Sequence, residues 1–201
     1  MKMLERRSFF LPLLAGVAVV LCGVLLSDIS GAASRYRKLD RVLADTAFTD
    51  AQKASISRAY GSVVGAGGDR REALDLVKAC LEGEFQARQV VRILSLTAQL
   101  ELAGLPAEEF VHKVKEGVAK GIEGKKILEV AERRALSLRK ATNLLNRLIL
   151  DGYEIDDREL LLTAVAEALE EGKKEKQLRE RIIRGLEKGE SARRIGRAIY
   201  R

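Results

Sequence analysis

The residues from 125 to 151 contain neither glycine nor proline, and this uninterrupted stretch limits what the chain can fold into. Apolar residues recur there at three- and four-residue intervals from Leu128 to Ile149, and Thr142 is the one polar residue of the series. The spacing predicts a single helix about 40 Å long, at about 1.5 Å per residue. A helix of that length needs neighbours along its apolar face, so the pattern favours antiparallel packing on other helices.

Several predicted helices are followed by a glycine that has apolar residues at fixed distances before it. Positions 11, 7 and 3 before Gly121 hold Phe110, Val114 and Val118, which lie on one helical face. The same spacing precedes three other glycines: Gly152, Gly172 and Gly189. A left-handed glycine commonly ends a helix, so we expect positive φ angles at Gly121 and Gly172. Glycine-capped amphipathic helices explain this spacing, and true helical-hairpin repeats are the alternative.

Composition and capping residues predict an all-α fold. Aromatic residues make up only 4% of the chain, strand patterns are nearly absent, and Ala, Leu, Glu, Lys and Arg dominate. Three predicted N-terminal caps are Thr49 with Gln52, Asp69 with Glu72, and Asp156 with Glu159. We expect about eight helices in antiparallel hairpins, as a helical bundle or a short solenoid-like array, with one long helix near 125–150.

Residues 1–33 have the pattern of a targeting segment. A short basic region is followed by an uncharged apolar run from Phe9 to Leu26 and by small residues up to Ala33. This order predicts a signal peptide, or an uncleaved N-terminal membrane anchor, because the run is just long enough to span a bilayer. We expect an exported protein that is periplasmic, or membrane-anchored and facing the periplasm. The rest is expected to form an N-terminal helical subdomain (34–103) and a C-terminal helical-hairpin subdomain (104–201).

The sequence contains no recognisable catalytic, cofactor-binding or metal-binding pattern. The glycine-rich stretch 65–68 lacks the preceding strand of a dinucleotide-binding loop, and the acidic stretch 151–159 departs from a calcium-binding loop. His112 is the single histidine, and a surface position is expected for it. Cys80 shares a helical face with Leu76, which predicts a buried thiol. We therefore predict a protein that is not an enzyme and that needs no cofactor or metal.

The basic charge of the chain is concentrated in its C-terminal segment. Residues 173–201 hold 11 Lys and Arg against 4 Asp and Glu. Arginine clusters bind phosphate and carboxylate groups, so this segment is the predicted binding surface. The residues assigned to it are Arg179, Arg181, Arg184, Arg193, Arg194, Arg197 and Arg201. The predicted partner is a protein or an anionic envelope surface, and nucleic acid is disfavoured because the protein is expected to be exported.

Two short motifs resemble known families. The stretch from Glu116 to Ile122 resembles uncharacterised exported all-helical bacterial proteins, a resemblance that implies no function. Phe48-Thr49-Asp50-Ala51-Gln52 resembles the LTxxQ motif of small periplasmic chaperones, which implies ATP-independent binding of unfolded clients. The leading functional hypothesis is an exported, non-enzymatic helical binding or scaffolding protein of the bacterial cell envelope. The alternatives are an ATP-independent periplasmic chaperone and an envelope enzyme that uses carboxylates.

Overall fold

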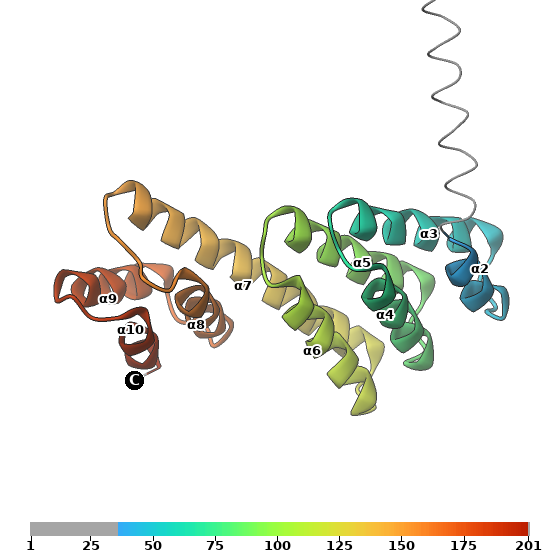
Figure 1. Ribbon diagram of the computed structural model, residues 1–201. Helices are drawn as coiled ribbons and strands as arrows, with labels where there is room; N and C mark the ends of the chain where they lie inside the picture. Colours follow the sequence, from blue (N-terminus) through green and yellow to red (C-terminus); the bar gives the residue numbers. More distant parts are fainter. Residues whose placement is uncertain (1–35, 201) are drawn as a thin grey trace, which may run out of the picture. The chain divides into compact units, whose positions relative to one another are not determined.

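The computed structural model describes residues 36–200 and divides the chain into two units, Met1–Ala47 and Phe48–Arg201 (Figure 1). The described part of the first unit contains one helix, α2 (Arg37–Ala44). The predicted targeting segment lies outside the described residues. Within 36–200, no helix has both the length and the apolar character that crossing a bilayer requires. The subdomain boundary predicted near Gly104 stays a prediction.

The second unit is built from eight helices joined by short turns. With α2 they make nine helices and no strand among residues 36–200, which confirms the all-α class. The predicted long helix is confirmed as α7. The helices of this unit are α3 (Asp50–Gly65), α4 (Arg70–Glu82), α5 (Ala87–Leu102), α6 (Ala107–Ala119), α7 (Gly124–Leu150), α8 (Arg158–Glu170), α9 (Glu175–Glu187) and α10 (Ala192–Ile199).

Two of the three predicted N-terminal caps are confirmed. Thr49 and Gln52 form a reciprocal capping box at the start of α3, and the Asp69 carboxylate accepts two backbone N–H bonds at the start of α4. The prediction that Asp156 caps α8 is wrong, because Asp157 accepts the bond from the Leu160 N–H. Asp156 instead accepts from the Ala192 N–H, 2.9 Å away at the start of α10.

All seven helices from α3 to α9 end in the same hydrogen-bonded turn. The second residue beyond each helix has a positive φ, and the N–H of the next residue returns to a carbonyl oxygen five residues back. At α6 these residues are Gly121, with φ 67°, and Ile122, which donates to Gly117. This is the Schellman motif, which satisfies carbonyl groups that a helix end leaves unpaired. The positive φ angles predicted for Gly121 and Gly172 are therefore confirmed.

At the end of α4, a glutamate takes the left-handed position that glycine takes elsewhere. Gly83 has φ −81°, whereas the next residue, Glu84, has φ 55°. Packing explains why glycine stands one position earlier. A Cβ atom at Gly83 would lie 3.0 Å from the Phe85 ring and 3.2 Å from the side chain of Val118. Close packing therefore favours a glycine at 83, and Glu84 carries the backbone strain.

The positive-φ residues show a repeated helical unit. Three helices of 13 residues, α4, α6 and α9, each lie between two such residues that are 17 positions apart. The three pairs are Gly67 and Glu84, Gly104 and Gly121, and Gly172 and Gly189. Because α4 and α5 begin 37 residues before α6 and α7, equivalent positions in these two helix pairs are 37 residues apart. The fold of this unit is thus a short array of helical hairpins.

Helix α7 interrupts the regular array. It has 27 residues, whereas its counterpart α5 has 16. Eleven extra residues make just over three turns, so they lengthen the helix by about 16 Å and hardly change which face it presents. The first half of α7 packs with α5 and α6, and α8 then packs directly on α7 (Figure 1).

The buried stripe of α7 differs from the predicted one. Ala131, Leu138 and Leu145 are buried as expected, but Ile149 is 44% exposed and Leu128 is only half-buried. Ile127 and Leu148, one position earlier in each case, are buried instead. The predicted stripe followed apolar residues at three- and four-residue intervals, a narrow pattern that suits packing against one partner helix. The observed stripe is broader because α7 packs with α5, α6, α8 and α9.

We predict that Gly121→Ala and Gly172→Ala each lower the free energy of unfolding by about 1 kcal/mol, because alanine is strained at positive φ. A Cβ atom would meet nothing within 4 Å at either position, so the loss measures backbone strain alone. Urea unfolding curves provide the measurement.

Gly65→Ala is the matched control, because Gly65 ends α3 without a positive φ and also has open space around it. This change should leave stability unchanged or raise it by a few tenths of a kcal/mol. Conversely, Glu84→Gly should stabilise the protein by about 0.5 to 1 kcal/mol. Equal effects at Gly65, Gly121 and Gly172 would contradict the capping role.

Candidate functional site

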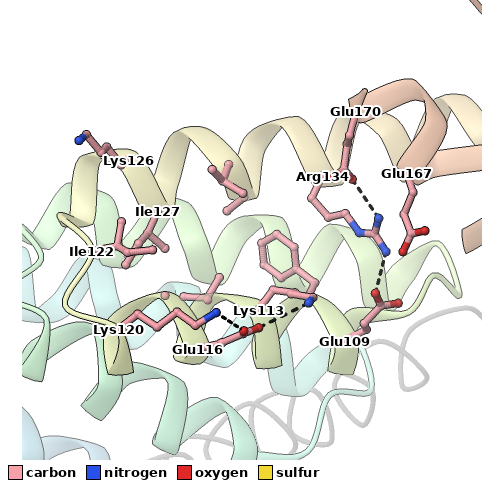
Figure 2. Close-up of a pocket in the computed structure, with 15 residues that line it drawn as sticks. Glu109, Lys113, Glu116, Lys120, Ile122, Lys126, Ile127, Arg134, Glu167 and Glu170 are labelled. Atoms are coloured by element: carbon pink, nitrogen blue, oxygen red, sulfur yellow. Dashed lines mark hydrogen bonds and ion pairs between the residues drawn. The ribbon is translucent and has the colours of Figure 1, made fainter. Parts of the chain in front are cut away.

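A groove of about 610 Å³ runs along α6 and α7 and reaches the C-terminal part of α8. Figure 2 shows that its side chains come from both helices of the α6–α7 hairpin, with two glutamates added from α8. The residues that line it are Glu109, Phe110, Lys113, Val114, Glu116, Gly117, Lys120, Ile122, Lys126, Ile127, Val130, Ala131, Arg134, Glu167 and Glu170.

The floor of the groove is apolar and partly open to solvent. Phe110 and Val114 of α6 and Ile127 of α7 are buried. Gly117 lets the two helices approach closely, because a Cβ atom there would lie 3.1 Å from the Ile127 side chain. Val130 is 50% exposed and Ile122 is 43% exposed. An apolar floor of this kind can bury an apolar partner surface.

One end of the groove is rich in lysine. Lys120 and Lys126 lie near the turn between α6 and α7, with Glu116 and Lys113 further along (Figure 2). Glu116 forms ion pairs with Lys120 at 2.5 Å and with Lys113 at 3.4 Å. Its bond with Lys120, together with the positive charges of both lysines, lowers the pKa of the Glu116 carboxyl. Lys126 forms no ion pair with a described acidic residue.

The other end of the groove is acidic and is organised by Arg134. The Arg134 side chain is 8% exposed, and it bridges Glu109 of α6 at 2.7 Å and Glu170 of α8 at 3.0 Å (Figure 2). Burial acts to lower the pKa of this guanidinium, but the hydrogen bond to Glu170 and the neighbouring glutamate charges outweigh it and raise the pKa. Arg134 therefore stays charged, and it joins α6, α7 and α8 at this point.

A second contact orders Glu167 at the acidic end. The Tyr200 hydroxyl donates a hydrogen bond to the Glu167 carboxylate. Burial and the negative charge of Glu167 raise the pKa of Tyr200, so the phenol stays protonated as the donor. The Lys173 ammonium group also lies 5.6 Å from the centre of the Tyr200 ring and donates to the Ile199 carbonyl oxygen. These contacts attach α10 to α8, beside the groove.

The groove matches a surface that is covered elsewhere in the array. The groove positions 113, 114, 117, 127, 130, 131 and 134 correspond to Leu76, Val77, Cys80, Val90, Ile93, Leu94 and Thr97, 37 residues earlier. All seven of these earlier residues are at most 2% exposed. They belong to α4 and α5, and α6 packs against both of those helices. Of the seven groove positions, Lys113 and Val130 are exposed whereas their counterparts are buried. These two positions mark where the next helix of a regular array would lie.

The predicted basic surface lies on α9 and α10. All six of its described arginines are exposed, and the seventh, Arg201, lies outside the described residues. Arg179 pairs with Asp151 at 2.9 Å, and Arg194 lies 3.7 Å from Glu190. Arg184 donates to a carbonyl oxygen of its own helix. Arg181, Arg193 and Arg197 have no described acidic side chain within 4.0 Å. Part of the predicted surface is therefore uncompensated positive charge.

The repeat also relates the basic surface to the groove. Helices α9 and α10 begin 68 residues after α6 and α7. Lys113, Lys120 and Lys126 thus correspond to Arg181, Lys188 and Arg194, and Glu116 corresponds to Arg184. Glu116 pairs with two lysines of the groove, whereas the basic surface has an arginine, Arg184, at the equivalent position. The 17-residue interval from Gly104 to Gly121 and from Gly172 to Gly189 is the sequence signal for this relation, whereas no local pattern predicts the groove.

Cys80 and His112 lie apart from the groove and the basic surface. Cys80 is completely buried, as predicted, and its burial raises the pKa of the thiol to about 12. His112 is exposed, also as predicted. Among residues 36–200, no group of three or more His, Cys, Asp or Glu side chains is arranged to hold a metal ion.

Comparison with protein-family models, curated proteins and solved structures finds no match for this chain. The class of protein is therefore defined by the structure alone: an all-α array of helical hairpins that carries an apolar groove and a basic surface.

We predict that Arg134→Ala lowers the free energy of unfolding by about 2 kcal/mol, because it removes two charge-assisted hydrogen bonds and leaves two carboxylates close together. Arg139→Ala on the same helix is the control. Arg139 is exposed and has no described ion pair, so its loss should cost less than about 0.5 kcal/mol. Equal unfolding midpoints for the two variants in urea would show that the bridge contributes no stability.

Proposed function

We propose that this protein is an exported, non-enzymatic binding or scaffolding protein of the bacterial cell envelope, and that the groove on α6 and α7 is its protein-binding surface. The observation that carries the proposal is the repeat equivalence. The same surface on α4 and α5 is covered by a helix, α6, whereas the groove keeps Val130 half-exposed. A helix from a partner would bury the exposed side chains of Ile122 and Val130. Contact of an apolar helix face with a hydrophobic groove is how helix-in-groove complexes form.

The location in the envelope is supported by the sequence of residues 1–33. A basic region, an apolar run and small residues occur in the order that directs export. Binding without catalysis is favoured because the single histidine of the sequence, His112, lies on the surface and Cys80 is completely buried, so that they do not form a nucleophile–base pair.

The basic surface favours a second contact, with an anionic envelope surface. Arg181, Arg193 and Arg197 carry exposed charges that no described acid neutralises. Phospholipid headgroups and acidic glycans are the polyanions available to an exported protein. Each basic residue close to an anionic membrane contributes about 1 kcal/mol of binding, and salt screens this attraction.

To test the groove, we predict that a photoreactive phenylalanine analogue at position 130 crosslinks to a discrete partner in living cells. The same analogue at position 136 is the control, because Leu136 is 51% exposed on the same helix but does not line the groove. Mass spectrometry identifies the crosslinked segment, which is then synthesised. Its affinity should fall at least about tenfold with Val130→Asp and remain unchanged with Leu136→Asp.

Identical products from both positions would contradict a binding role for the groove. A broad range of products from position 130 alone would instead favour the ATP-independent chaperone, which binds many unfolded clients.

To test the basic surface, we predict that the mature protein sediments with anionic vesicles but not with neutral ones, and that high salt releases it. Changing Arg193, Arg197 and Arg201 together to Glu should reduce this binding more than tenfold. The matched control changes Lys125, Arg139 and Lys140 to Glu, which alters the net charge by the same amount at exposed positions elsewhere. If both triple variants bind equally, the basic surface has no specific docking role.

A further inference from the structure

The direction of α4 relative to α6 indicates how a helix would lie in the groove. Glu72 near the start of α4 and Glu108 near the start of α6 line one hollow. At the other ends of these helices, Gly83 lies beside Val118. The two helices therefore run parallel, each displaced from the other by one unit of the array. A helix that took the equivalent place on α6 and α7 would run parallel to α6.

The charges of the groove agree with that direction. A helix parallel to α6 would place its N-terminus near Glu109, Glu167 and Glu170, and its C-terminus near Lys120 and Lys126 (Figure 2). A helix carries a partial positive charge at its N-terminus and a partial negative charge at its C-terminus. Among the residues that line the acidic end of the groove, three are glutamates and one is Arg134. The adjoining hollow adds one base, Arg133, and one acid, Glu171, so the excess of negative charge remains. Both ends of the groove therefore attract the helix terminus that the repeat geometry assigns to them.

The shape of the groove limits the apolar face of the occupant. Val130 of α7 and Ile122 of the turn are the exposed apolar side chains of the groove, and they lie beside the buried Phe110 and Ile127. Helix α6, which covers the equivalent surface, has 13 residues. An occupant of similar length would span about 20 Å and place an apolar residue on the floor at every turn.

We infer that the groove binds an amphipathic helix of a partner protein, about 13 residues long and parallel to α6, with acidic side chains in its last turn. This inference rests on the proposed function, and it specifies the orientation and the charge of the segment that the groove accepts. Acidic residues in the last turn lie opposite Lys120 and Lys126. Acidic residues in the first turn would meet Glu167 and Glu170 and be repelled.

Two stapled, fluorescently labelled peptides of identical composition test this orientation. Both carry the same apolar face. One has lysines in the first turn and glutamates in the last turn, and the other has these charges exchanged. The staple keeps both helical, so a difference in affinity does not reflect helix propensity. Fluorescence anisotropy with the mature full protein should give at least tenfold tighter binding of the first peptide at low salt, and this ratio should fall as salt is added.

Variants of the protein test the orientation of the helix separately from the groove as a binding surface. Lys126→Glu should reduce the preference between the peptides at least fivefold, whereas Lys140→Glu, on the exposed side of α7, should leave it unchanged. Val130→Asp should weaken the binding of both peptides, and Leu136→Asp should leave the binding of both unchanged. Circular dichroism and urea unfolding check that all four variants are folded.

Three results would overturn the inference in distinguishable ways. If both peptides bind equally and Val130→Asp weakens the binding of both, the orientation is refuted but the groove remains a binding surface. No binding of either peptide would count against the groove itself, and with it the proposed function. A crosslink from position 130 to a second copy of this chain would replace the partner protein with self-association.

Discussion

From α3 to α9, each helix is followed at its second position by a residue with positive φ, and this residue determines the direction in which the chain leaves the helix. At each such residue, its own N–H and the N–H of the next residue donate to carbonyl oxygens of the preceding helix, and the chain turns into the next helix. Because α4, α6 and α9 have equal lengths between these turns, equivalent faces recur along the chain. The array therefore depends on uniform helix ends as much as on its core, and this explains why even Glu84 adopts the strained conformation.

One departure from this regularity produces the candidate site. The additional three turns of α7 carry the chain past the place where the layer of α4 and α6 would continue, and α8 packs on α7 instead. The surface left on α6 and α7 keeps the apolar floor of its counterpart, but Lys113 replaces a leucine and Arg134 a threonine at equivalent positions. Arg134 then closes one end by bridging two helices. The basic surface lies on the faces of α9 and α10 that are equivalent to the groove faces of α6 and α7, and it carries Arg184 where the groove carries Glu116.

Local signals were sufficient to predict much of the fold. The glycine stops at Gly121 and Gly172, the capping box at Thr49 and the long helix each depend on a few neighbouring residues, and the structure agrees with all of them. The error at Asp156 arose because a carboxylate one position from a helix start can cap either of two helix termini, and α10 lies 36 residues away. The stripe predicted for α7 failed at Ile149 because sequence periodicity does not reveal how many helices pack around one helix.

The sequence by itself determined that this chain is helical, where most helices begin and end, and that positive charge gathers in residues 173–201, because these properties follow from local backbone chemistry and composition. Only the tertiary structure decided which faces are covered. Lys113, Glu116 and Lys126 look like ordinary solvent-exposed residues in the sequence, and they become part of one groove only when α6 folds against α7. Arg134 likewise acquires its role from Glu109 and Glu170, 25 and 36 residues away, through contacts that no local pattern encodes.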